Sequence, residues 1–139
     1  MSVSGERKTA LIVHPDLAML SKYQTRLAAE EYTPIVARDL PTALLAITQH
    51  YFDLAIVSSQ LNEPGDGWPL AGVLHLVFPK SFIAVLVPGT DLMALQAAIN
   101  NGVQEVFDAD HAPESVVAAA LGALNPSAAK KPRGRAHVQ

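Results

Sequence analysis

The fold is decided by one stretch near the middle of the chain, Phe52-Asp53-Leu54-Ala55-Ile56-Val57-Ser58-Ser59-Gln60-Leu61. Its apolar run is short, follows a turn-like Phe-Asp pair and ends in small polar residues. Such a run indicates a strand that is buried on both faces and is followed by a loop. Strands of this type are typical of parallel sheets, whose two faces are covered by helices.

The same alternation of short apolar runs and helical patterns occurs five times along the chain. We expect strands near residues 9–13, 33–37, 54–58, 83–87 and 105–107. Helices are expected at about residues 16–31, 41–50, 68–77, 91–101 and 113–124. Pro41 and Pro113 suit the first turn of a helix, and Gly102 suits a left-handed cap. The pattern predicts an α/β protein with a doubly wound, five-stranded parallel sheet of order 2-1-3-4-5, a flavodoxin-like arrangement.

Composition and charge separate a body from a tail. The chain has 139 residues, 50 % of them hydrophobic, and no cysteine, which fits one domain with a single core and no disulfides. No stretch approaches the ~20 apolar residues of a membrane span, and the first residues lack a signal-peptide pattern, so a cytoplasmic protein is expected. We expect an N-terminal extension over residues 1–7, a domain over 8–125 and a basic, disordered tail over 126–139.

Over roughly residues 8–125 this layout resembles the receiver domains of response regulators. In that family the strand equivalent to residues 54–58 ends in the aspartate that accepts a phosphoryl group, and Ser58 stands at that position. The resemblance places the other functional positions of the family as follows: the metal-binding acidic pair at His14 and Pro15, the switch hydroxyl at Val87, the switch aromatic at Val106 and the conserved lysine at Ala109.

These replacements would remove the family's chemistry. A serine cannot form an acyl phosphate, and Mg²⁺ would lose the clustered carboxylates that hold it. Only Asp16 remains close to the pocket. We therefore expect no metal, no cofactor and no enzymatic activity. The sequence predicts a pseudo-receiver, a signalling module that acts through protein contacts without phosphorylation.

The residues at the carboxyl ends of the expected strands suggest two other activities, nucleophilic catalysis and metal binding. His14 and Ser58 should face one another on neighbouring strands, with Asp16 or Asp108 as an orienting acid, and a Ser–His pair is the start of nucleophilic catalysis. No GxSxG motif and no evident oxyanion hole accompany the pair, so polar strand ends that satisfy loop backbone are favoured. His111 lies beside Asp108 and Asp110, where a weak metal site competes with a solvated loop, and the loop is favoured.

The fourth and fifth expected helices are almost uncharged, which makes them a candidate partner or self-association face. We expect Leu92, Leu95 and Ile99 to face the sheet in the fourth, and Val117, Leu121 and Leu124 in the fifth. The outward set would then be Met93, Ala97, Ala118, Ala119 and Gly122. An inert surface of helix-forming alanines is the alternative. Trp68 is expected to pack over the start of the third helix rather than to anchor a partner.

The tail contains Lys130-Lys131-Pro132-Arg133-Gly134-Arg135. Its Pro-Arg-Gly-Arg core resembles AT-hook motifs, which lie in the minor groove of A·T-rich DNA, although Ala136 stands where a proline usually follows. A generic basic tail with weak, salt-sensitive binding to polyanions is favoured over a hook. The alternative function is thus a DNA-associated protein, tethered through Lys130, Lys131, Arg133 and Arg135.

Overall fold

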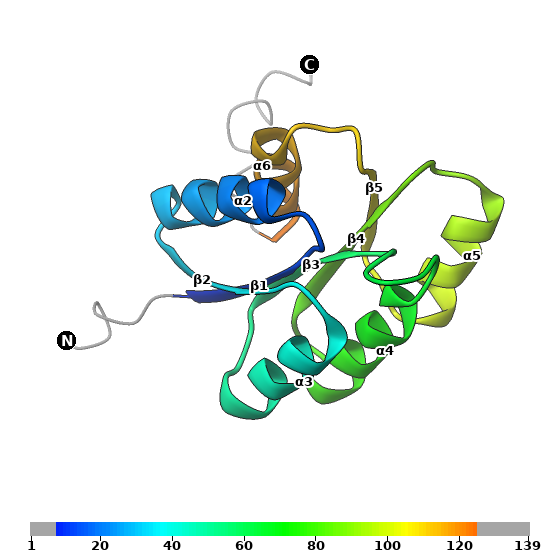
Figure 1. The fold of residues 1–139 in the computed structure, drawn as a ribbon, viewed down its shortest axis with the longest axis horizontal. Helices are drawn as coiled ribbons and strands as arrows, with labels where there is room; N and C mark the ends of the chain where they lie inside the picture. Colours follow the sequence, from blue (N-terminus) through cyan, green and yellow to red (C-terminus); the bar gives the residue numbers. More distant parts are fainter. Residues whose placement is uncertain (1–7, 125–139) are drawn as a thin grey trace, which may run out of the picture.

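A computed structural model describes residues 8–124 of the chain (Figure 1). Its strands are β1 Lys8–Val13, β2 Tyr32–Ala37, β3 Leu54–Ser58, β4 Phe82–Val87 and β5 Glu105–Asp108. Its helices are α2 Leu17–Ala29, α3 Leu40–Gln49, α4 Gly67–Val77, α5 Leu92–Asn100 and α6 Pro113–Leu124. The expected elements are all present, with ends that differ by one or two residues. Within residues 8–124, no helix is long and apolar enough to cross a membrane.

The five strands are parallel and lie in the order β2-β1-β3-β4-β5, as the alternating pattern predicted. Helices α2 and α6 cover one face of the sheet, and α3, α4 and α5 cover the other (Figure 1). The central strand β3 pairs with β1 on one side and with β4 on the other. It is buried along its whole length between the two helical layers, which explains its uninterrupted apolar run.

Aspartates begin three of the helices at the carboxyl ends of the strands. The carboxylates of Asp16, Asp39 and Asp91 accept hydrogen bonds from backbone N–H groups in the first turns of α2, α3 and α5, each at 2.9 Å. Such caps satisfy N–H groups that have no partner inside the helix. Pro41 lies in the first turn of α3, and Gly102 has a φ of 70°, as expected from the sequence.

The orientation of α5 differs from the expectation. Leu92, Leu95 and Ile99 were expected to face the sheet, but their side chains are 78 %, 46 % and 79 % exposed. The helix instead turns its small residues inward: Ala98 is buried, and Ala94 packs against the core below α3 and α4. A stripe of small side chains lets a helix approach a sheet closely, and here it covers a β5 strand of only four residues.

Helix α6 follows the expectation more closely. Val117 is buried, while Leu121 and Leu124 pack against the core between the sheet and α2. Ala118 and Ala119 are exposed, as expected, whereas Gly122 is partly buried. Helix α6 therefore exposes small residues such as Ala118 and Ala119 beside Glu114, whereas α5 exposes large apolar residues beside Gln96 and Asn100.

Candidate functional site

Four of the residues singled out from the sequence lie together at the carboxyl ends of the strands. His14 and Pro15 follow β1, Ser58 ends β3 and Ala109 follows β5; all four line one shallow pocket of about 260 Å³. Val87 is buried at the end of β4 and lines a neighbouring hollow. Val106 packs against the core, and Asp16 caps α2, so neither lines the shallow pocket.

Ser58 uses its hydroxyl to organise the loop that follows β3. The hydroxyl donates a hydrogen bond of 2.8 Å to the carbonyl oxygen of Gln60 and accepts one of 3.2 Å from the Gln60 N–H group. The side chain is nearly buried, so these bonds satisfy polar atoms that would otherwise lose water. The loop then returns to the strand end, where the Gly67 N–H group donates to the Ser59 carbonyl at 3.0 Å.

His14 is also committed to local structure. Its Nδ1 atom accepts a hydrogen bond of 3.0 Å from the backbone N–H of Asp16, and its own backbone N–H donates to the Ala37 carbonyl at 3.1 Å. Burial lowers the pKa of the imidazole, and the negative charge of Asp16 opposes this shift only in part. His14 and Ser58 therefore share a pocket, but each side chain is bonded to its own loop. This geometry does not assemble a nucleophile with its base.

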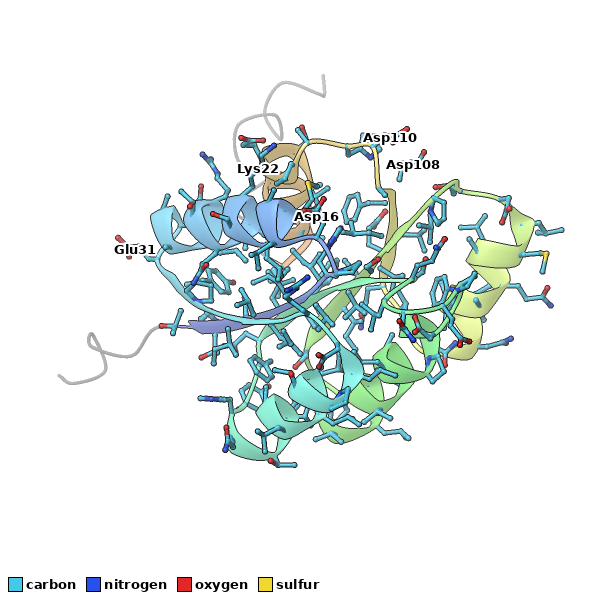
Figure 2. All side chains as sticks on the ribbon, in the orientation of Figure 1. Asp16, Lys22, Glu31, Asp108 and Asp110 are labelled. Carbon is cyan, nitrogen blue, oxygen red and sulfur yellow. The ribbon has the colours of Figure 1, made fainter. Side chains whose placement is uncertain are left out.

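Carboxylates do not converge on the shallow pocket. Within residues 8–124, no group of three or more histidine, aspartate or glutamate side chains is placed to hold a metal ion. Figure 2 shows Asp16 at the start of α2. Asp108 and Asp110 lie apart from it, where β5 ends and the following loop begins. The backbone N–H of His111 donates to the Asp108 carbonyl at 3.0 Å, which closes a turn in that exposed loop.

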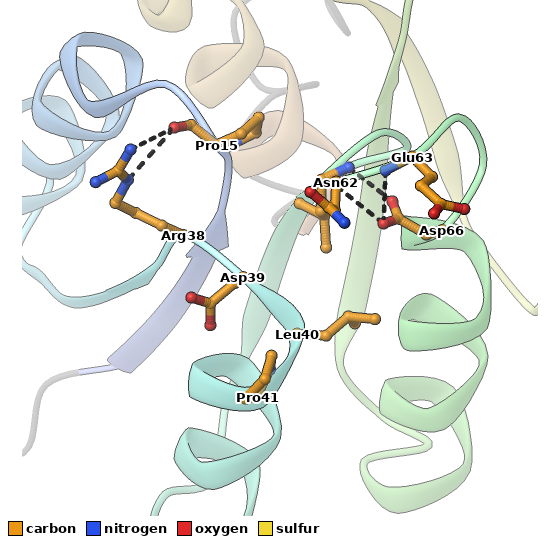
Figure 3. Close-up of a pocket in the computed structure, with 9 residues that line it drawn as sticks. Pro15, Arg38, Asp39, Leu40, Pro41, Asn62, Glu63 and Asp66 are labelled. Atoms are coloured by element: carbon orange, nitrogen blue, oxygen red, sulfur yellow. Dashed lines mark hydrogen bonds between the residues drawn. The ribbon is translucent and has the colours of Figure 1, made fainter.

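A second, larger hollow of about 630 Å³ lies beside the first, at the N-terminal ends of α3 and α4 (Figure 3). Asp66 shapes it: its carboxylate accepts hydrogen bonds from the backbone N–H groups of Leu61, Asn62 and Glu63 at 2.7, 2.9 and 3.0 Å. Burial alone would raise the pKa of Asp66, but these three bonds to the charged form outweigh it and lower the pKa. This role of Asp66 was not predicted from the sequence.

Arg38 is the one basic side chain that lines this hollow. Its guanidinium donates to the carbonyl oxygen of Pro15 through two nitrogens, each at 3.4 Å, and so points away from Asp39 and Asp66 (Figure 3). The carboxylates of Asp39 and Asp66 are likewise bonded to nearby backbone. The polar groups of the hollow thus hold loops in place, and Asp39 and Glu63 are its exposed acids.

Known structures with this arrangement share one fold. A response regulator receiver domain (CheY-like) from Methanospirillum hungatei JF-1 matches with a TM-score of 0.78 at 21 % identity, over 90 % of this chain and 99 % of that one. The fold is that of a receiver domain. The signal receiver domain of an HD domain-containing protein from Pseudomonas fluorescens Pf-5 matches with a TM-score of 0.76 at 26 % identity, over 89 % of this chain and 99 % of that one.

A further structural match contains a phosphorylated aspartate, a modification that a serine cannot carry. It is a response regulator protein from Burkholderia pseudomallei with a phosphorylated aspartic acid, calcium ion and citrate; its TM-score is 0.73 at 20 % identity, over 90 % of this chain and 75 % of that one. No protein-family model matches the sequence, and a search of curated proteins finds no match. The likeness to receivers is therefore one of fold.

Trp68 lies where the sequence placed it within the receiver fold. It is partly buried and packs against the core beneath α3 and α4, as expected for a residue at the start of the third expected helix. It also lines a hollow of about 530 Å³ with Met93 and Ala97 of α5. Ala97, which was expected to face outward, is therefore partly buried against this hollow rather than freely exposed.

Proposed function

We propose that this receiver-fold domain is a non-enzymatic signalling module that acts through protein contacts and without a phosphoaspartate. The observation that carries the proposal is Ser58 at the end of β3, with its hydroxyl bonded to both backbone groups of Gln60. A carboxylate that accepts a phosphoryl group becomes an acyl phosphate. A serine hydroxyl cannot form that product.

The surroundings of Ser58 support the same proposal. Phosphoryl transfer to a carboxylate needs a metal ion held by oxygen ligands, which neutralises the transferring group. The pocket around Ser58 is lined by His14, Pro15 and Ala109, and by Ser59, Gln60, Leu86 and Pro88. Pro15 and Ala109 bring no charge, and the lowered pKa of His14 favours its neutral form. These groups offer neither a magnesium site nor a cation that would pair with a phosphate.

Helix α5 is the surface best suited to a protein partner. It contains no charged residue, and Leu92, Met93, Leu95 and Ile99 are all exposed on it. Exposed apolar patches on a folded domain mark interaction sites more often than isolated apolar residues do. Of the face expected from the sequence, Met93, Ala118 and Ala119 are exposed, while Ala97 and Gly122 are partly buried. The proposed partner face is therefore centred on α5, with α6 at its margin.

Amide NMR with beryllofluoride and Mg²⁺ tests this function. The complex mimics a phosphorylated aspartate when carboxylates hold the metal, so we expect the spectrum of the full-length chain to stay unchanged. Shifts that cluster on Ser58, His14 and Ala109 would contradict the proposal. A titration with Mg²⁺ alone is the control that separates metal binding from binding of the anion.

The alternative function, tethering to DNA, rests on Lys130, Lys131, Arg133 and Arg135. These residues lie outside the described part of the chain, which ends at Leu124. The proposal for them remains the one made from the sequence: a basic segment that binds polyanions in a salt-dependent manner.

A further inference from the structure

Helices α3 and α4 carry an apolar surface that is separate from the α5 face. Neither helix contains an aspartate, glutamate, lysine or arginine. On α3 and the residues after it, Leu44, Leu45 and Tyr51 are exposed. On α4 the exposed set is Val73, Leu76 and Val77, and Leu76 is 80 % exposed. We call these six residues the α3–α4 patch.

The α3–α4 patch is one surface rather than two. The helices lie side by side on the same face of the sheet and contact one another (Figure 1). Helix α4 turns Leu70, Ala71 and Leu74 into the core, so Val73, Leu76 and Val77 must occupy its other side. His75 lies against Gly102 at the end of α5, which places the one titratable side chain of the two helices away from the patch.

Among residues 8–124, the charged side chains that border the patch lie at its two ends, and the two ends differ in sign. At the N-terminal ends of α3 and α4 stand Asp39, Glu63 and Asp66, around the larger hollow (Figure 3). At the C-terminal ends stands Lys80, whose side chain is exposed. Arg38 lines the same hollow; its guanidinium donates to Pro15, and its positive charge offsets part of the negative charge of the three acids. The surface therefore has a net negative charge at one end, an apolar middle and one exposed lysine at the other end.

We propose that a second copy of this chain docks on the α3–α4 patch in an antiparallel, two-fold arrangement. A two-fold contact brings the same patch of each copy together, so a residue near the axis meets its own counterpart. Val73 is midway in sequence between Asp66 and Lys80, and an axis near Val73 brings the Lys80 end of each copy over the acidic end of the other. The uncharged middle puts no like charges opposite one another.

The charge pattern favours this occupant over others. A lipid surface is a poor fit, because the apolar patch lacks the lysine and arginine residues that draw a helix to anionic headgroups. A second copy supplies both an apolar middle and ends of the complementary sign. This contact goes beyond the proposed function, since it leaves the α5 face free for another protein.

Sedimentation velocity on the full-length chain, from about 1 to about 100 μM, tests the proposal. We expect a concentration-dependent shift from the 14.8 kDa monomer toward twice that mass. Leu76→Glu should weaken the association at least tenfold, because it places a charge in the middle of the contact. Leu17→Glu on α2 is the matched control: its side chain is 61 % exposed and lies outside both the α3–α4 patch and the α5 face, so the variant should dimerise as the wild type does.

Charge reversal at the ends tests the antiparallel arrangement. Lys80→Glu should weaken the dimer, and adding Glu63→Lys in the same chain should restore it, since each copy then carries the reversed pair. Circular dichroism should show that all variants are folded, because every substituted side chain is exposed. A wild type that stays monomeric at about 100 μM would overturn the proposal. So would association of Leu76→Glu that is no weaker than that of Leu17→Glu, or a double reversal no better than Lys80→Glu alone.

Discussion

The Ser58 hydroxyl and the Gln60 backbone are bonded in both directions: Oγ donates to the carbonyl at 2.8 Å and accepts from the N–H at 3.2 Å. The residue therefore has a structural task, which is to turn the chain as it leaves the central strand. In a receiver fold, this is the position that the resemblance assigns to the phosphorylated aspartate. The short hydroxyl fits beside the Gln60 backbone. Among the described residues, no carboxylate side chain lines the pocket around Ser58.

Restoring an aspartate alone should not restore phosphorylation. We expect Ser58→Asp to gain no phosphoryl group from acetyl phosphate and Mg²⁺, because His14, Pro15 and Ala109 still supply neither metal ligands nor a lysine. The combination His14→Asp, Pro15→Asp, Ser58→Asp and Ala109→Lys should gain one. Intact-mass spectrometry distinguishes the two variants. Equal modification of both would show that the residues around position 58 do not control the reaction.

Gly67 should tolerate no side chain. A β-carbon there would overlap the backbone oxygen of Ser58, so Gly67→Ala must displace either the strand end or the start of α4. We expect it to lower the free energy of unfolding by about 3 kcal/mol or more. Gly89→Ala is the control, because a β-carbon at Gly89 meets nothing within 4 Å, and it should change stability by less than about 0.5 kcal/mol. Urea denaturation measures both values.

The lowered pKa of His14 should make stability depend on pH in one direction. The folded-state pKa lies below the ordinary value of 6.5, so the unfolded chain binds a proton more readily. The contribution of neutral His14 to the free energy of unfolding is complete above pH 6.5. It is lost as the pH falls toward the folded-state pKa of His14. Urea unfolding at about pH 7.5 and about pH 5 should show a smaller pH-dependent loss for His14→Asn than for the wild type. Identical losses would contradict the assignment to His14.

Hydrophobic patterning was sufficient to predict the sheet. Each strand is a short apolar run between two helical patterns, and parallel strands joined by crossover helices leave few alternative orders. The predicted order of the strands is confirmed, as are the first-turn place of Pro41 and the positive φ of Gly102. The shared pocket of His14 and Ser58 also followed, because the first and third strands are neighbours and both end there.

The predicted orientation of α5 was wrong, because the largest apolar residues were expected to face the sheet. Ala94 and Ala98 pack inward instead, and Leu92 and Ile99 remain in solvent. Residue size alone does not reveal how closely a helix approaches a short edge strand. The role of Asp66 was missed for a related reason: its three backbone donors lie three to five residues before it, in a loop that has no periodic pattern.

Removing residues 127–139 tests the alternative function. These residues lie outside the described part of the chain, and their sequence has few apolar side chains, so we expect the deletion to change Tm by less than about 2 °C. If the full-length chain binds a DNA duplex, affinity should fall steeply with salt and fall again in Arg133→Ala with Arg135→Ala. A preference for A·T-rich over G·C-rich duplex would favour the hook, and no binding at low salt would eliminate the DNA function.

The most direct test of the central claim is intact-mass spectrometry of the full-length chain after incubation with acetyl phosphate and Mg²⁺. A receiver fold with Ser58 at the end of β3, and without carboxylates to hold the metal beside it, should keep its mass unchanged. The four-residue variant described above serves as the positive control. A stoichiometric gain of one phosphoryl group on the wild-type chain, located in residues 8–124, would contradict the account.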